Sequence, residues 1–188
     1  MPAVAAPAPL AHRYFFALLP DAVTARRIHA FAEQTFGAKG LMRPDRLHVT
    51  LAITPDFDGP DPDLTAALLR AGEAVAAAPF DIMLDRLSGG QRTVALRPEY
   101  SLSPLRALQA GIARAMAEQG AAMRPDWRFS PHLTLVYRDG DNVSQAIEGF
   151  SWAVREFVLI KSLVGLTRHE VLGRWPLRAA TDPQHMLI

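Results

Sequence analysis

The sequence contains no cysteine. Disulfides, thiolate catalysis and cysteine-based zinc or iron–sulfur sites are therefore excluded, and the absence fits a protein of the reducing cytoplasm. No apolar run approaches the roughly 20 residues that a membrane-spanning helix needs. A flexible tail is predicted over residues 1–12, because its beginning is rich in alanine and proline and lacks the basic residues of a signal peptide.

A strong charge of either sign is also lacking, since the formal net charge is +1. Extended binding along a nucleic acid requires many neutralised phosphates, so we expect a short anionic ligand or only the end of a polynucleotide. The sequence has no dense carboxylate cluster to hold a metal ion, and we expect neither a metal nor a cofactor. Apolar residues make up 49% of the 188 residues, which is enough for a real core.

Strand and helix signals alternate along the chain. Apolar segments predict strands over residues 13–19, 47–53, 80–87, 93–97, 132–137, 152–163 and 170–177. Helices are predicted over residues 21–36, 64–78, 105–118 and 142–148. Asp21 and Ser103 are the expected N-caps of the first and third helices, and Ser88-Gly89-Gly90 is expected as a turn. No composition break separates independent domains, so the prediction is one α+β domain over residues 13–188.

Two segments on predicted strands nearly duplicate each other: His48-Val49-Thr50-Leu51 and His132-Leu133-Thr134-Leu135. Each follows a basic segment that contains proline. Because side chains two residues apart in a strand point to the same face, each segment presents a histidine beside a threonine while its apolar residues pack inward. A single histidine in a strand is usually a surface or hydrogen-bonded residue, and threonine favours strands in any case. The duplication favours a functional pair in one cleft.

Paired histidines suit the cleavage of a phosphoester. One group must take a proton from the attacking water, and another must give a proton to the leaving oxygen. Two histidines can hold these opposite protonation states near neutral pH, and each transfer contributes about 10²–10⁴ in rate. The hydroxyls of Thr50 and Thr134 would donate to the nonbridging oxygens as charge shifts on phosphorus. The sequence therefore predicts metal-independent acid–base catalysis by His48 and His132.

These tetrads resemble those of the 2H phosphoesterases. Within that superfamily the chain is similar to the bacterial RNA 2′,3′-cyclic phosphodiesterases, first described as 2′-5′ RNA ligases. The likeness extends to residues 13–20, 47–53, 130–135, 157–163 and 169–177. It implies a bilobal α+β fold, in which two antiparallel-sheet lobes with outer helices are related by a pseudo-twofold axis. Each lobe would then place one tetrad in a central cleft.

The resemblance also implies a reaction, which is hydrolysis of a 2′,3′-cyclic phosphate on RNA ends or small nucleotides to a 2′-phosphomonoester. By that analogy His48 protonates the departing 3′ oxygen and His132 activates the water, while the two threonines hold phosphate oxygens. The family can also run the reverse reaction and join RNA ends through a 2′-5′ bond. No membrane and no obligate protein partner are implied. A monomer is the expected state, since the charge is near neutral and the sequence has no exposed zipper-like pattern.

The sequence departs from many relatives directly after the second tetrad, where they have a small residue and then arginine. Here Val136 and Tyr137 follow, and Arg138 comes one place later. A one-residue shift along a strand turns a side chain to the other face. Arg138 therefore needs a bulge or a strand end to reach the phosphate, whereas Tyr137 offers a hydroxyl or a ring for stacking.

Further substrate contacts are predicted from residue type alone. Four arginines near the tetrads are candidates for the cleft mouth, although such residues are more often solvated loop charges: Arg43, Arg46, Arg124 and Arg128. Trp127 and Phe129 are candidates for base stacking, while Phe15 is expected in the core. The other histidines are expected at surface, turn, tail or helix-surface positions: His12, His29, His169 and His185.

Two alternative functions remain open at this point. One is a noncatalytic module that binds nucleotides or RNA ends, which the displaced Arg138 alone supports. The other is a related phosphodiesterase with a different substrate, such as a 2′-5′ oligonucleotide or a cyclic phosphate of ADP-ribose.

Overall fold

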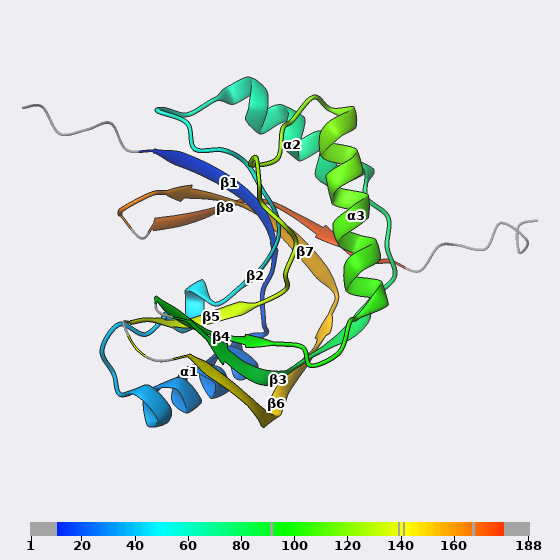
Figure 1. Cartoon of the computed structure of the whole chain (residues 1–188). Helices are drawn as coiled ribbons and strands as arrows, with labels where there is room; N and C mark the ends of the chain where they lie inside the picture. Colours follow the sequence, from blue (N-terminus) through cyan, green and yellow to red (C-terminus); the bar gives the residue numbers. More distant parts are fainter. Residues whose placement is uncertain (1–10, 91, 139, 141, 167, 179–188) are drawn as a thin grey trace, which may run out of the picture.

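The computed structural model describes residues 11–90, 92–138, 140, 142–166 and 168–178. Over these residues one antiparallel sheet has the strand order β6-β3-β4-β5-β2-β1-β7-β8 (Figure 1). The strands are β1 (His12–Leu18), β2 (Val49–Ile53), β3 (Phe80–Gly89), β4 (Thr93–Arg97), β5 (Leu133–Tyr137), β6 (Val143–Val154), β7 (Glu156–Leu163) and β8 (Arg168–Pro176). The helices are α1 (Ala22–Phe36), α2 (Pro62–Ala74), α3 (Ser103–Glu118) and the 3₁₀ turn η1 (Pro44–Arg46). The predicted α+β class is confirmed.

The sheet divides into two lobes of matching strand order. The first lobe is β2-β1-β7-β8 and the second is β5-β4-β3-β6. They join where β2 pairs with β5, through Val49 and Leu133. Each lobe contains a strand–helix–strand unit, β1-α1-β2 in the first and β4-α3-β5 in the second. The two tetrads therefore begin equivalent strands at the centre of the sheet.

The helices of these two units cover opposite lobes. Helix α1 packs against β5 and β6 of the second lobe, whereas α3 packs against β2 of the first lobe as well as against β3. Helix α2 lies beside α3 and packs against β7 and β8. Figure 1 shows α1 at the bottom near β6, and α2 and α3 side by side at the upper right. This exchange ties the lobes together, because each helix buries apolar surface of the other lobe.

Strand β1 is buried on both faces, which explains its continuous apolar sequence. Tyr14, Phe16 and Leu18 belong to the large core between the sheet and the helices. Phe15 and Ala17 point to the opposite face and pack with Val158 and Ile160 of β7. The prediction that Phe15 is a core residue is therefore confirmed, although its cluster lies on the face away from the main core.

Two predicted elements are wrong in the second half of the chain. The helix predicted over residues 142–148 is wrong, because residues 143–148 form the start of β6, which pairs with β3 along its length with a register shift between Leu84 and Arg86. Pairing with β3 outweighs the local helical spacing, because Val143 and Ile147 then pack against the core. The predicted strand over residues 152–163 is two strands that break at Arg155, where the chain leaves the second lobe for the first.

The helix boundaries differ in detail from the prediction. Asp21 caps α1 as expected, since its carboxylate accepts from the backbone N–H groups of Val23 and Thr24. Helix α2 ends at Ala74 rather than at residue 78, because Val75 leaves the helical conformation. Ser103 is inside α3 rather than its N-cap, and Leu102 occupies the cap position without a side-chain bond.

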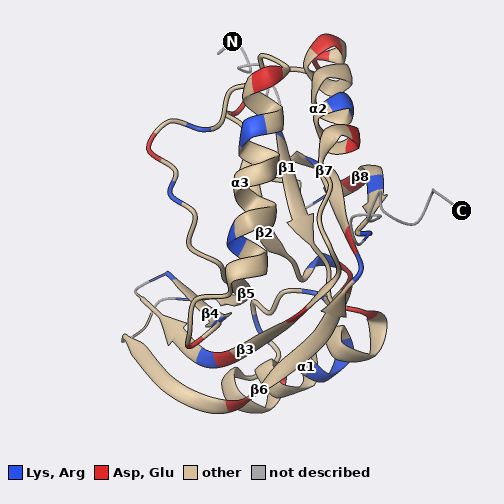
Figure 2. Cartoon of the chain, turned by 90° about the vertical axis from the view of Figure 1, so that its right-hand side faces the viewer, with Lys and Arg blue, Asp and Glu red and all other residues tan. Residues whose placement is uncertain are grey.

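The ends of the chain and its charges complete the description. The predicted tail falls mainly outside the described residues, except that β1 already begins at His12. His185 also lies outside them. On the face drawn in Figure 2, basic and acidic residues are interspersed over helices and strands, in agreement with the small net charge. Among the described residues no helix is long and apolar enough to span a membrane.

Candidate active site

His48 and His132 occupy equivalent positions, each directly before its motif strand. The Nδ1 atom of His48 donates to the carbonyl oxygen of Arg46 at 2.7 Å. The Nδ1 atom of His132 donates to the carbonyl oxygen of Ser130, also at 2.7 Å. Because a carbonyl oxygen only accepts, Nδ1 carries the proton in both rings. Each neutral ring therefore keeps a free lone pair on Nε2, and each protonated ring has an Nε2–H to donate.

Thr50 and Thr134 are also placed by equivalent backbone geometry. Thr50 lies opposite Ala17 of β1, and the register shifts between Phe16 and Ala17. Thr134 lies opposite Ala95 of β4, and the register shifts beside that alanine as well. Such irregularities bend a strand and re-aim its side chains, while the small partner leaves room above the sheet. The match between lobes extends from the tetrads to the strands that support them.

The histidine and threonine side chains of both tetrads, His48, Thr50, His132 and Thr134, line one cavity of about 500 Å³, here called the central cleft. Its other walls come from β1, the segment before η1, the end of β5 and the β7–β8 turn. These lining residues include Arg13, Phe15, Gly40, Leu41, Met42, Arg46, Ile53, Tyr137, Ser162, Leu163, Val164, Gly165 and His169. The cleft is large enough for a nucleotide-sized ligand, and the two histidines can act on one group bound inside it.

Burial sets the protonation of the histidine pair. It lowers the pKa of His48 below the ordinary 6.5, against the opposing effect of the bond to the Arg46 carbonyl, and the charges of His132 and Arg46 lower it further. Burial also lowers the pKa of His132, with a contribution from the Arg97 charge. Both rings therefore favour the neutral form in the free protein. A bound anion would favour the imidazolium form, because opposite charge stabilises it.

Comparison with known proteins decides the family. A family model described as the 2′-5′ RNA ligase superfamily matches residues 19–165. The chain belongs to this superfamily. It is also 30% identical over 174 residues to RNA 2′,3′-cyclic phosphodiesterase of Escherichia coli K12, in a match that covers 88% of this chain and 96% of that protein.

Solved structures agree with this membership. E. coli LigT complexed with 3′-AMP has a TM-score of 0.71 and 27% sequence identity, and the match covers 89% of this chain and 98% of the LigT chain. LigT has also been crystallised with ATP and with phosphate. TT0787 of Thermus thermophilus has a TM-score of 0.74 and 20% sequence identity. The match covers 90% of this chain and 100% of that chain, and it supports the fold alone. The expected 2H phosphoesterase architecture is thereby confirmed.

The candidate substrate contacts are divided between the cleft and the outside of the molecule. Tyr137 lines the cleft at the end of β5 and is 62% exposed. Arg138 lies over the ring of Phe36, with its guanidinium carbon 4.9 Å from the ring centroid. It is not among the described lining residues of the cleft. With arginine one place later than in many relatives, Tyr137 rather than Arg138 lines the cleft together with Thr134.

Trp127, Phe129 and Arg43 lie away from the cleft lining. The rings of Trp127 and Phe129 pack against each other with centroids 6.2 Å apart, and Phe129 also contacts the main core. Arg43 is an exposed residue that forms an ion pair with Asp45. Their roles as substrate contacts remain predictions that would require a longer ligand reaching beyond the cleft.

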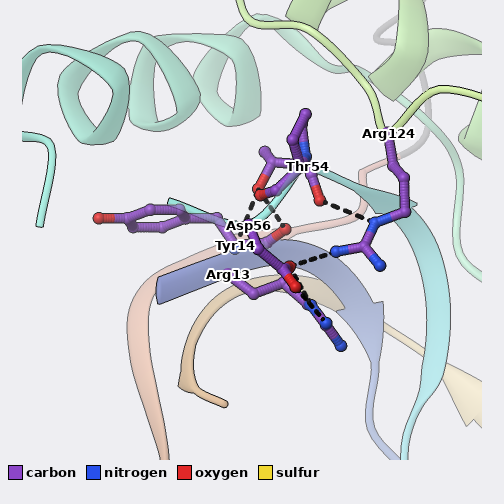
Figure 3. A network of polar contacts seen from close by, with 6 residues as sticks. Arg13, Tyr14, Thr54, Asp56 and Arg124 are labelled. Atoms are coloured by element: carbon purple, nitrogen blue, oxygen red, sulfur yellow. Dashed lines mark hydrogen bonds and ion pairs between the residues drawn. The ribbon is translucent and has the colours of Figure 1, made fainter. Parts of the chain in front are cut away.

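Arg124 has a different role from a solvated loop charge. It and Arg13 both bind the carboxylate of Asp56, as Figure 3 shows, and Arg13 does so through Nε and Nη2 at 2.7 Å. Arg124 also donates from Nε to the carbonyl oxygen of Thr54 and from its backbone N–H to that of Ile53. These contacts attach the segment before β5 to the end of β2. The hydrogen bonds and charges of Arg13 and Arg124 lower the pKa of Asp56.

His169 is the main cleft residue that the sequence did not reveal. It was expected at the surface or in a turn, but it lies in β8 and lines the cleft with its ring centroid 5.6 Å from that of His48. The ring of Phe15 is 4.9 Å from His48 and forms part of the same wall. No local pattern marks His169, because only the β1–β7–β8 pairing brings it beside the first tetrad.

Proposed function

We propose that this protein hydrolyses a 2′,3′-cyclic phosphate, at an RNA end or on a nucleotide, to a 2′-phosphomonoester without a metal ion. The observation that carries the proposal is the convergence of both His–Thr pairs on one cleft with identical Nδ1 anchors. The name of the E. coli relative supports the same reaction. The LigT complexes with 3′-AMP, ATP and phosphate support a nucleotide-sized ligand.

The reaction follows from two opposed proton transfers. One histidine takes a proton from water through Nε2 as the water oxygen forms a bond to phosphorus. The bond between phosphorus and O3′ breaks, and the other histidine gives its Nε2 proton to O3′. The 2′ ester bond stays intact, so the product is a 2′-phosphate with a free 3′-hydroxyl. Afterwards the first histidine is protonated and the second is neutral, and proton exchange with solvent restores the starting state.

We assign His48 as the acid and His132 as the base, following the family resemblance. The Nδ1 anchor allows either ring to serve either role, because each holds Nε2 free for the substrate side. Thr50 and Thr134 are assigned to the nonbridging phosphate oxygens, where their hydroxyls would donate hydrogen bonds. Tyr137 is assigned to the nucleoside part of the ligand, since its exposed ring borders the cleft.

The proposal is tested by product analysis with a substrate panel in EDTA. Nucleoside 2′,3′-cyclic phosphates, an RNA ending in a cyclic phosphate, a 2′-5′ oligonucleotide and a cyclic phosphate of ADP-ribose are incubated with the protein, and products are assigned by ³¹P NMR. We expect the first two to give 2′-phosphomonoesters in EDTA. Tight binding without product would instead support a noncatalytic binding module, and cleavage of only the other substrates would replace the proposed one.

A further inference from the structure

Three aromatic rings meet at the wall of the central cleft that holds His48. The centroid of His48 lies 4.9 Å from that of Phe15 and 5.6 Å from that of His169, and the last two are 5.4 Å apart. Phe15 is tilted by 33° against His48, whereas His169 meets it edge-on at 73°. Two different rings therefore contact His48, in addition to its Nδ1 hydrogen bond.

Arg46 links the two histidines of this wall. Its carbonyl oxygen accepts from His48, and its Nη2 lies 3.2 Å from Nε2 of His169. A guanidinium only donates, so Nε2 of His169 accepts and the ring is neutral, with its proton on Nδ1. Burial, followed by the charges of Arg46 and His48, lowers the pKa of His169 to about 4, while Asp45 acts in the opposite direction. At neutral pH His169 therefore adds no charge beside His48.

We propose that His169 is a positioning residue for His48, held in place by its hydrogen bond from Arg46. This inference rests on the proposed function. A single hydrogen bond at Nδ1 leaves the His48 ring free to rock about that bond, and contact with Phe15 and the edge of His169 restricts this motion. His169 thereby keeps Nε2 of His48 aimed at the reacting phosphate. The geometry matters because a displacement of about 1 Å can cost 10²-fold in rate.

The surroundings of His132 in the second lobe differ from those of His48. Among the described residues, no aromatic side chain pairs with the ring of His132. Its anchor is Ser130, whose hydroxyl accepts from Arg97 at 2.8 Å. The two lobes thus share the Nδ1 anchor but differ in how the ring is packed. His169 accordingly serves His48 and not His132.

The charged groups around His48 come from residues other than His169. Arg46 and His132 lower its pKa through their charges. The cleft is also lined by Arg13, Tyr137 and His169, and no carboxylate is among its described lining residues. Because His169 is neutral, removing its ring should change the motion of His48 more than its charge environment.

Kinetics of His169→Ala and His169→Phe test the positioning role. The alanine variant removes the ring contact, and we expect kcat to fall by about 10–100-fold with KM changed by less than about threefold. Phenylalanine preserves a ring edge at the same place and should restore most of the lost kcat. Thermal unfolding of both variants verifies that they fold. A normal kcat in the alanine variant, or an effect confined to KM that follows base identity, would overturn the proposal.

NMR of His48 tests the same role without requiring turnover. The ring ¹⁵N shifts of His48 in the wild-type protein should show a protonated Nδ1 and an unprotonated Nε2, and in His169→Ala the ¹³C relaxation of the His48 ring should report a more mobile ring. The ring should stay restrained in His169→Phe, which keeps a ring at this position, and in Arg43→Met, which removes an exposed arginine paired with Asp45. Unchanged motion of the His48 ring in His169→Ala would overturn the inference. A wild-type protein that hydrolyses no cyclic phosphate would refute the proposed function alone, since these signals do not depend on it.

Discussion

At the residue scale, the backbone rather than another side chain fixes the chemistry of the two catalytic candidates. The carbonyl oxygens of Arg46 and Ser130 each hold a histidine Nδ1 at 2.7 Å. This leaves both Nε2 atoms free in the neutral state, and burial favours that state by lowering the pKa of each ring. Both rings of the free protein are thus ready to accept a proton, and the proposed anionic substrate would stabilise an imidazolium through its opposite charge.

The lowered pKa values of His48 and His132 predict an acid-shifted pH profile. Activity falls at low pH when the base becomes protonated, and at high pH when the acid loses its proton. Since both pKa values lie below the ordinary 6.5 in the free protein, the maximum of kcat/KM should lie below pH 6.5. Initial rates at low substrate concentration, measured in overlapping buffers of constant ionic strength, test this. A maximum above about pH 7.5, a full unit beyond the ordinary histidine pKa, would contradict the account.

Some residues of the cleft could be predicted from the sequence and others could not. Duplication of the His–Thr pattern predicted four side chains that the structure brings to one cleft. Arg138 was considered because its position is close in sequence to the second tetrad, but it lies over Phe36. His169 and Arg13 could not be assigned to the cleft, because neither belongs to a repeated pattern. Their positions depend on pairing between distant strands.

At the element scale, strands with strong apolar patterns were predictable and the weaker pattern of β6 was not. β1, β2, β4 and β5 lie close to their expected positions because alternation or a continuous apolar run identifies them locally. The start of β6 has mostly exposed side chains and a helix-compatible sequence. Its strand conformation comes from pairing with β3, a tertiary contact that local spacing does not contain.

The attachment of the segment before β5 to the first lobe gives a prediction at this scale. Asp56→Asn removes the charge that holds Arg13 and Arg124, so the free energy of unfolding should fall by about 1 kcal/mol, a modest value because these groups are partly exposed. Asp45→Asn is the matched control, since its ion pair with Arg43 is more exposed, and it should cost less than about 0.5 kcal/mol. Urea denaturation measures both variants. Equal effects would show that the Asp56 contacts do not stabilise the junction.

At the scale of the whole molecule, two similar lobes build one asymmetric site. The matching strand order, the alanines opposite Thr50 and Thr134, and the shared Nδ1 anchors reflect the similarity. The aromatic wall at His48 and the exposed Tyr137 on the other lobe produce the asymmetry. Neither lobe is a complete site, because each contributes one histidine of the proposed catalytic pair. Sequence predicted this division through the duplication but not the exchange of helices between lobes.

A double-mutant comparison tests the central claim that His48 and His132 act as one catalytic pair. Hydrolysis of a nucleoside 2′,3′-cyclic phosphate is measured in EDTA for His48→Ala, His132→Ala and the double variant. Each single variant should lose at least about 10²-fold in kcat, and the double variant should be little worse than either, because a pair that works as a unit is disabled by one loss. Retention of wild-type rates in either single variant, or losses that multiply in the double variant, would contradict the account.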